Sequence, residues 1–314
     1  MQRKVSRRPI LLVALGGNAL IQKGEEGTID QQFRNLKSPL RQVAELSASY
    51  RIIITHGNGP QVGNLLMQQE ACTSVPRLPL EILVAQTEGQ IGYMIESSLD
   101  EALMARGIHY RPLVSLITYV AVDRNDPAFA NPTKPIGPVF PEEALDKLPF
   151  PVMKTAKGYR RVVASPNPVT IIEKREIKQL IEMDFIVICC GGGGIPVIRK
   201  RRGFNGVDAV IDKDMASAKL AEEIGVDLFL IATDEKGVAL NYGTEKQRFL
   251  DSVTCEAAKQ HLSDGQFPPG TMGPKVSAAV QFAEKTGRRA VIASIKRIDK
   301  AVLGKAGTEF LADS

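Results

Sequence analysis

Five short runs of β-branched and other apolar residues recur along the chain, and segments with helical periodicity separate them. The runs are Ile10–Leu15, Tyr50–Thr55, Phe185–Cys190, Leu228–Ala232 and Ala290–Ser294. Continuous apolar runs of this length are typical of parallel strands buried on both faces. Between them, apolar residues fall at helical spacing, as at Val276, Ala279, Val280 and Ala283. The alternation predicts an α/β fold with a mainly parallel sheet covered by helices on both sides.

One stretch, residues 123–168, interrupts this alternation and carries nine of the nineteen prolines. Proline fixes its own φ and pushes the preceding residue toward extended conformations, which disfavours long helices and central strands. The stretch also contains too many large apolar residues for a solvated linker. We therefore predict an inserted lobe of short elements within a single domain over residues 1–314. It separates an N-terminal half, about residues 9–122, from a C-terminal half, about residues 169–314.

Three glycine-rich turns directly follow predicted strands: Gly16-Gly17-Asn18, Gly57-Asn58-Gly59-Pro60-Gln61 and Gly191–Gly194. Ligands of open α/β sheets bind at the carboxyl ends of the strands. Glycine there lets backbone N–H groups approach an anion closely. A single such turn is better explained as an ordinary tight turn that binds nothing. Three at equivalent places favour binding of a phosphate or carboxylate, although neither a Walker A motif nor a GxGxxG fingerprint is present.

Two lysines stand where a helix dipole disfavours a cation. Asp212 is an N-cap candidate for the helical run Met215–Ile224, and Lys213 follows it; Lys275 follows Pro274, which suits the first position of a helix. A bound polyphosphate reverses this preference, because it can use the helix N-terminus and the ammonium group together. Each lysine alone could be exposed with its head group in water, but two such sites favour nucleotide phosphates. Lys134 lies between two prolines, and from the residues alone it is a surface loop lysine.

Charge and cysteine content narrow the class of protein. The formal net charge is +5, but the basic runs Arg3-Lys4, Arg7-Arg8 and Arg199–Arg202 are not interleaved with aromatics, and the last run predicts a solvated hairpin tip. We therefore expect no nucleic-acid partner.

No apolar run approaches the roughly 20 residues of a membrane span, and Ile10–Leu15 is interpreted as a strand rather than part of a secretory signal. The four cysteines include no CxxC pair, which predicts free thiols in the cytoplasm.

Several stretches together resemble the carbamate kinases, a branch of the amino acid kinase family. They are VALGGNAL, HGNGPQVGNLL, NDPAFANPTKPIGP, RRVVASPNP, CCGGGGIPV, GVDAVIDKD and PPGTMGPK, which together span essentially the whole chain. The resemblance implies an open αβα sandwich in which residues 123–168 form a protruding subdomain that closes over the acceptor. It also implies that the N-terminal half binds the acceptor, that the C-terminal half binds the nucleotide, and that the protein is a homodimer in arginine metabolism.

The resemblance assigns residues on the acceptor side. Those that would bind the transferring phosphoryl group are Gly16, Gly17 and Asn18, and those that would cradle the acceptor are Gly57, Asn58 and Gly59. Lys134 would contact the acceptor and the transition state, which lifts it from a surface lysine to a catalytic candidate.

On the nucleotide side, Lys213 would neutralise the transferring phosphate, and Asp214 would orient the lysines around it. Lys275 would contact the nucleotide phosphates. The other residues implied in nucleotide binding are Asp212, Tyr242 and Met272, the last two of which would flank the adenine.

The implied reaction is reversible transfer between ATP and carbamate, giving ADP and carbamoyl phosphate. Mg²⁺ would be held mainly by the nucleotide phosphates, so no protein ligand of the metal is assigned. Carbamate is already an anionic nucleophile, so no general base is needed, and His56 is as easily a turn residue as a ligand contact. One departure is the turn Thr233–Val238, which reads TDEKGV where the family more often has TDVDGV. Lys236 then replaces an acid on the nucleotide side, which leaves nucleotide affinity open.

Two alternatives remain open. A kinase of the same family acting on another small acid is disfavoured because Ala14 occupies the place of the lysine in the KxGG motif of amino acid kinases. A catalytically silent nucleotide sensor is disfavoured because all three lysines are retained.

Overall fold

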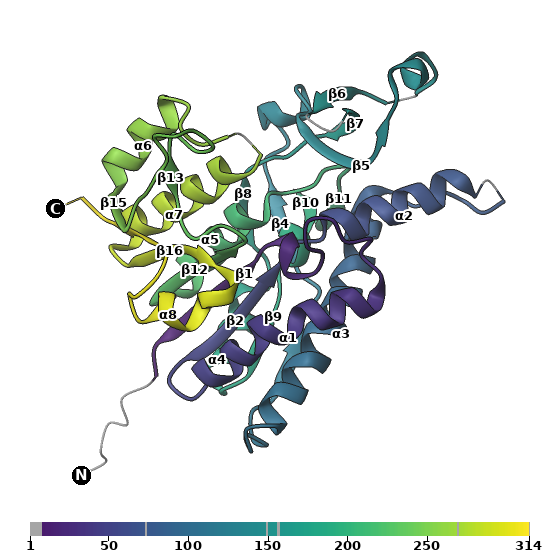
Figure 1. Ribbon diagram of the computed structural model, residues 1–314. Helices are drawn as coiled ribbons and strands as arrows, with labels where there is room; N and C mark the ends of the chain where they lie inside the picture. Colours follow the sequence, from purple (N-terminus) through teal and green to yellow (C-terminus); the bar gives the residue numbers. More distant parts are fainter. Residues whose placement is uncertain (1–7, 73, 149, 156–157, 269, 314) are drawn as a thin grey trace, which may run out of the picture.

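An eight-stranded sheet runs through the computed structural model, which describes residues 8–72, 74–148, 150–155, 158–268 and 270–313 (Figure 1). Its strands, in spatial order, are β15 (Ser252–Thr254), β17 (Thr308–Leu311), β16 (Arg289–Ser294), β12 (Leu228–Thr233), β1 (Ile10–Leu15), β2 (Arg51–His56), β9 (Ile186–Ile188) and β3 (Leu113–Ser115). β17 runs antiparallel to β16, and the other neighbours are parallel. The five predicted strands are confirmed. The third, predicted over Phe185–Cys190, is shorter than expected: β9 ends at Ile188, and Cys190 turns into the left-handed region with φ of 51°.

Helices cover both faces of this sheet. On one face lie α1 (Ile29–Leu46), α3 (Leu80–Met104) and α8 (Ile298–Val302); on the other lie α4 (Lys174–Glu182), α5 (Lys213–Ile224), α6 (Cys255–Ser263) and α7 (Met272–Thr286). Alternate side chains of β1 serve the two layers: Leu11 and Val13 pack with the first group, and Leu12 and Ala14 with the second. The open αβα sandwich is therefore confirmed.

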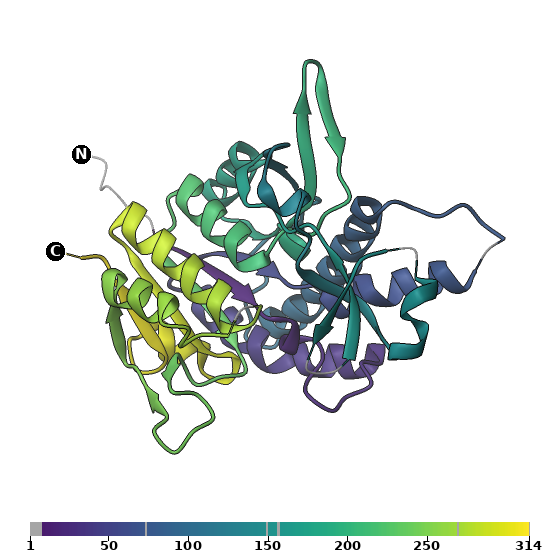
Figure 2. The ribbon, with the colours of Figure 1, turned by 90° about the horizontal axis from the view of Figure 1, so that it is seen from above.

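A smaller sheet lies beside the main one. Its order is β11 (Gly203–Gly206), β10 (Ile195–Lys200), β4 (Tyr119–Val122) and β8 (Pro168–Ile171). β10 and β11 form an antiparallel hairpin that stands out from the body (Figure 2), with Arg201 and Arg202 at its tip. The predicted basic hairpin is thus confirmed, whereas Arg3, Lys4 and Arg7 lie outside the described residues.

The proline-rich stretch forms a protruding lobe. It contains a three-stranded antiparallel sheet in the order β5 (Lys134–Phe140), β7 (Gly158–Val163) and β6 (Val152–Thr155), with short 3₁₀ turns at Pro127–Phe129 and Glu142–Lys147. β5 is an edge strand, which is where a strand tolerates proline. The lobe rests on α2 (Gly59–Ala71), beside β5, as Figure 1 shows. The two backbones come close there, because a Cβ on Gly63 would lie 3.2 Å from the Cα of Gly137.

Within the described ranges, no helix combines the length and apolar character needed to cross a bilayer. The cysteines are free thiols, with Cys72 exposed and Cys189, Cys190 and Cys255 buried.

Candidate active site

The first two glycine turns meet at the carboxyl ends of the central strands. The N–H of Gly16 donates to the carbonyl oxygen of Ala232 at 3.0 Å, and the N–H of Gly57 donates to that of Leu15 at 3.1 Å. A Cβ on Gly57 would lie 3.4 Å from both the backbone nitrogen of Gly17 and the Cδ of Lys213. The loops after β1 and β2 therefore converge on the first turn of α5.

Asp212 explains why Lys213 sits at that point. Its Oδ1 accepts from the N–H of Asp214 at 2.9 Å and from that of Met215 at 3.3 Å, which caps α5 as predicted. The cap places Lys213 and Asp214 in the first turn of the helix, which points its N-terminus toward the glycine loops.

A single carboxylate holds two of the three candidate lysines. Asp214 Oδ1 lies 2.5 Å from Lys213 Nζ, and its Oδ2 lies 2.9 Å from Lys275 Nζ. Lys275 reaches it because α7 packs beside α5. The helix begins at Met272, two residues before Pro274, so this proline lies inside the first turn rather than at its first position. Its missing N–H costs nothing there, because first-turn N–H groups have no intrahelical partner.

Burial and charge set the protonation of this triad. Burial raises the pKa of Asp214, but Lys213 and Lys275 outweigh it and bring the pKa to about 2. Burial lowers the pKa of Lys213 despite the neighbouring carboxylate. Burial is also the largest single influence on the pKa of Lys275 and lowers it, but the charge and hydrogen bond of Asp214, with the charges of Asp212 and Asp234, together outweigh it and raise this pKa. At neutral pH, Asp214 is therefore an anion, and it lies between the amino groups of the two lysines.

Lys134 reaches the same region from the lobe. Its Nζ donates to the carbonyl oxygen of Ile211 at 3.2 Å and to Asp212 Oδ2 at 3.3 Å. The structure thus brings Lys134, Lys213 and Lys275 to the N-terminus of one helix, although the chain separates them widely.

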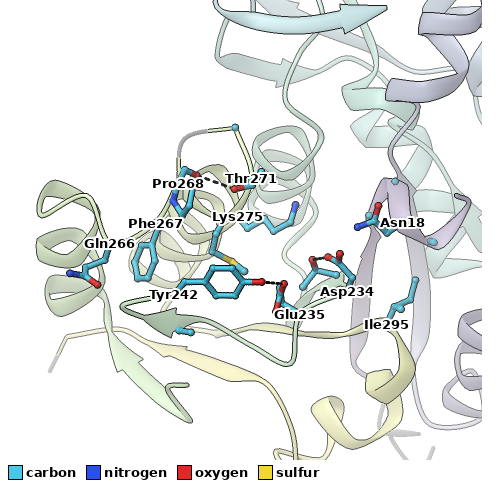
Figure 3. Close-up of a pocket in the computed structure, with 17 residues that line it drawn as sticks. Asn18, Asp234, Glu235, Tyr242, Gln266, Phe267, Pro268, Thr271, Lys275 and Ile295 are labelled. Atoms are coloured by element: carbon cyan, nitrogen blue, oxygen red, sulfur yellow. Dashed lines mark hydrogen bonds between the residues drawn. The ribbon is translucent and has the colours of Figure 1, made fainter. Parts of the chain in front are cut away.

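A cavity of about 380 Å³ opens beside this cluster (Figure 3). Six of the predicted site residues line it: Gly16, Gly17, Asn18, Tyr242, Met272 and Lys275. The other seven do not line it: Gly57, Asn58, Gly59, Lys134, Asp212, Lys213 and Asp214. Asp214 adjoins the cavity through its ion pair with Lys275, and Gly57 adjoins it through Gly17. Asp212, which the resemblance assigned to the nucleotide, caps α5 and pairs with Lys134 instead of lining the cavity.

Sequence reasoning missed several lining residues. Asp234, Glu235 and Phe267 all line the cavity, and the hydroxyl of Tyr242 donates to Glu235 Oε1 at 2.5 Å (Figure 3). The sequence drew attention to this turn through Lys236, but Lys236 is exposed and does not line the cavity. Of the two residues in this turn that depart from the commoner TDVDGV pattern, Glu235 lines the cavity and Lys236 does not.

The third glycine turn, Gly191–Gly194, packs against the end of β2 and the loop that follows it. A Cβ on Gly192 would lie 2.1 Å from Asn58 Nδ2, which donates to Thr87 Oγ1 at 2.8 Å. A Cβ on Gly191 would lie 2.5 Å from the ring of His56. Close packing against protein therefore explains this turn better than direct binding of an anion.

His56 is buried, and burial is the main cause that lowers its pKa to about 4. Its imidazole is therefore neutral at physiological pH, and it does not line the cavity.

The cavity also fits a nucleotide-bound divalent ion. The lysines occupy both oxygens of Asp214, whereas Asp234 offers an exposed carboxylate that accepts from Thr233 Oγ1 at 3.0 Å. Mg²⁺ commonly binds one or two carboxylates together with substrate phosphates, so a dedicated protein cage is not required. In the described ranges, the one close cluster of three ligating side chains is formed by Cys255, Glu284 and Asp313, and it does not line this cavity.

Comparison with known proteins identifies the family to which this sequence and fold belong. The sequence model of the amino acid kinase family matches residues 9–294. Carbamate kinase of Thermococcus kodakarensis is 45% identical over 313 residues, covering 96% of this chain and 99% of that protein. Carbamate kinase of Pyrococcus furiosus is also 45% identical, covering 96% and 98%. Among solved structures, carbamate kinase from Giardia lamblia bound to AMP-PNP superposes with a TM-score of 0.91 at 36% identity, covering 98% of this chain and 99% of that one. The chain therefore belongs to the amino acid kinase family.

Proposed function

We propose that this protein is a carbamate kinase, which transfers a phosphoryl group reversibly between ATP and carbamate. One observation carries the proposal: Lys213 and Lys275 share Asp214 at the point where the glycine loops meet the cavity. This arrangement concentrates positive charge and backbone N–H groups where a phosphoryl group would pass between two anionic substrates. The names of the relatives that match nearly the whole chain support carbamate as the acceptor.

In the proposed reaction, a carbamate oxygen attacks the γ-phosphorus of ATP. A new P–O bond forms while the bond to the β–γ bridging oxygen breaks, and its electron pair leaves with ADP. Lys213 and Lys275 stabilise the charge on the transferring group, and Asp214 holds their ammonium groups in place. The N–H groups around Gly16 and Gly17 bind the same group through the backbone. Carbamate needs no deprotonation, which accords with a buried, neutral His56.

A divalent ion, Mg²⁺ in this proposal, supplies further charge neutralisation when bound with the nucleotide. The nucleotide phosphates would hold it for the most part, with Asp234 as the carboxylate available in the cavity.

We further propose that the two halves of the chain bind different substrates. The N-terminal half binds carbamate through Gly57, Asn58 and Gly59, and the C-terminal half binds the nucleotide in the cavity. The lobe of residues 123–168 closes over the acceptor and presents Lys134, a role supported by the contact of Lys134 with Ile211 and Asp212.

Incubation with carbamoyl phosphate and MgADP tests the activity directly, with ATP as the measured product. We expect rapid ATP formation from carbamoyl phosphate and little from acetyl phosphate. Preference for acetyl phosphate would point to a kinase of another small acid. Binding of AMP-PNP without any ATP formation would point to a nucleotide sensor.

Assembly and location complete the proposal. We propose a homodimer formed through the outer face of α3, where Ile82, Gly89 and Tyr93 make an exposed and uncharged stripe. Light scattering should give twice the mass of one chain, and Tyr93→Glu should shift the protein to the monomer. A wild-type monomer would contradict the proposal.

Free cysteines accord with the cytoplasm, which we propose as the compartment.

A further inference from the structure

Glu235 and Tyr242 form a hydrogen-bonded pair at the edge of the cavity. The ring of Tyr242 lies along the cavity with its hydroxyl directed at Glu235, and the O···O distance is 2.5 Å (Figure 3). Lys275 lines the same cavity and extends toward Asp214. The two ends of the cavity therefore differ in charge. Lys275 places its amino group at the end near the N-terminus of α5, and Glu235 places its carboxyl group beside the ring of Tyr242.

Packing alone does not fix the position of Tyr242, because 53% of the residue is exposed. Tyr242 lies in the loop between β13 (Ala239–Leu240) and β14 (Arg248–Phe249), two strands of two residues each. Hydrogen bonds hold this loop on both sides of the ring. Besides the bond to Glu235, the N–H of Asn241 donates to Gln266 Oε1 at 2.9 Å.

We propose that Glu235 is a positioning residue that sets nucleotide affinity by holding Tyr242 in place as a wall of the base-binding end of the cavity. The inference rests on the proposed function, which places the phosphates at Lys275 and so the base near Tyr242. A ring already held in position does not have to be ordered when the nucleotide binds. Without the bond, binding loses the roughly 2- to 10-fold in affinity that ordering one such side chain costs.

Glu235 takes no part in phosphoryl transfer on this account, since it lies beside the ring rather than in the lysine cluster. Its loss therefore affects nucleotide binding and leaves the chemical step intact.

The test uses the full chain with Glu235→Val, Tyr242→Phe and the double variant. Glu235→Gln serves as the conservative rescue, because its amide oxygen still accepts from the hydroxyl. Lys236→Ala is the matched control, an adjacent exposed residue outside the cavity. Calorimetry gives the Kd of AMP-PNP, and ATP formation from carbamoyl phosphate gives kcat and both KM values.

We expect each single variant to raise the Kd of AMP-PNP and the KM of MgADP by 2- to 10-fold, with kcat and the KM of carbamoyl phosphate unchanged. The double variant should lose no more than either single one, since both break the same bond. Glu235→Gln and Lys236→Ala should match the wild type.

Additive losses in the double variant would overturn the proposal, because the two residues would then act separately. A lower Kd for Glu235→Val would also overturn it, because Glu235 would then act only by repelling the phosphates. Failure of the proposed function looks different: the wild type would form no ATP from carbamoyl phosphate. The AMP-PNP comparison among the variants would still decide whether the pair acts as a unit.

Discussion

Lys134 Nζ, in the protruding lobe, lies 3.2 Å from the carbonyl oxygen of Ile211, which is 77 positions further along the chain. The contact joins the protruding lobe to the turn that precedes α5. It gives the lobe a polar attachment beside Asp212, whose other oxygen caps the same helix. The position of the lobe and the geometry of the lysine cluster therefore both depend on the segment Ile211-Asp212.

Removing Lys134 should disturb the acceptor side more than the nucleotide side. We expect Lys134→Ala to lower kcat by at least about 10²-fold, as for other lost donors to a transition state, and to raise the KM of carbamoyl phosphate. The Kd of AMP-PNP, measured by calorimetry, should stay near the wild-type value. Lys154→Ala provides a control with an exposed lysine on β6 of the same lobe. Equal losses in both variants would show that Lys134 acts only through the surface charge of the lobe.

Lys213→Ala should reduce turnover by roughly 10²- to 10³-fold, the effect of removing one preorganised donor at a site of developing charge. Circular dichroism should show an intact fold, since the change leaves the cap by Asp212 in place. Lys285→Ala, at the far end of α7 and half exposed, should retain wild-type turnover. Wild-type turnover in Lys213→Ala would remove this lysine from the mechanism.

Asp214 should make stability depend on acidity. Its folded-state pKa of about 2 lies below the ordinary value of 3.8, so its contribution is present above about pH 4 and is lost as the pH falls toward 2. The difference corresponds to roughly 2 kcal/mol of unfolding free energy. Denaturant unfolding between pH 5 and 2 should show this loss in the wild type. Asp214→Asn should be less stable at pH 5 and should lack this component of the acid dependence.

Gly192→Ala should destabilise the protein by more than backbone strain alone. Its φ is +66°, and the added Cβ would lie 2.1 Å from Asn58 Nδ2. Gly265→Ala is the matched control, because its φ is +71° and no atom lies within 4 Å of the added group. Thermal melting should show a loss of roughly 1–2 kcal/mol for Gly265→Ala and a clearly larger loss for Gly192→Ala. If the clash is the cause, adding Asn58→Ala to Gly192→Ala should recover part of the stability.

Local signals in the sequence predicted the framework of the fold. Apolar runs such as Ile10–Leu15 identify buried strands because both faces of a parallel sheet are covered. Asp212 identified the start of α5 because an N-cap acts within three residues. The antiparallel pairing of β16 with β17 was not predictable in this way, since the short run Thr308–Leu311 carries no signal for its partner.

The site was predictable as a set of residues but not as a geometry. The shared bonds of Asp214 depend on the packing of α5 against α7, whose first turns lie about 60 positions apart, and no local pattern reports such packing. The departure at Glu235-Lys236 drew attention to the wrong member of the pair. Only the direction of each side chain distinguishes them, and a turn has no fixed periodicity from which to infer it.

The contact of Gly63 with Gly137 sets the spacing between α2 and the lobe. A Cβ on Gly63 would lie 3.2 Å from the Cα of Gly137, so a side chain at position 63 would push β5 outward by a few tenths of an ångström. Lys134 lies on the same strand, three residues before Gly137, and donates to Asp212 at 3.3 Å. The reach of this lysine toward Asp212 therefore depends on the absence of a single methyl group from α2.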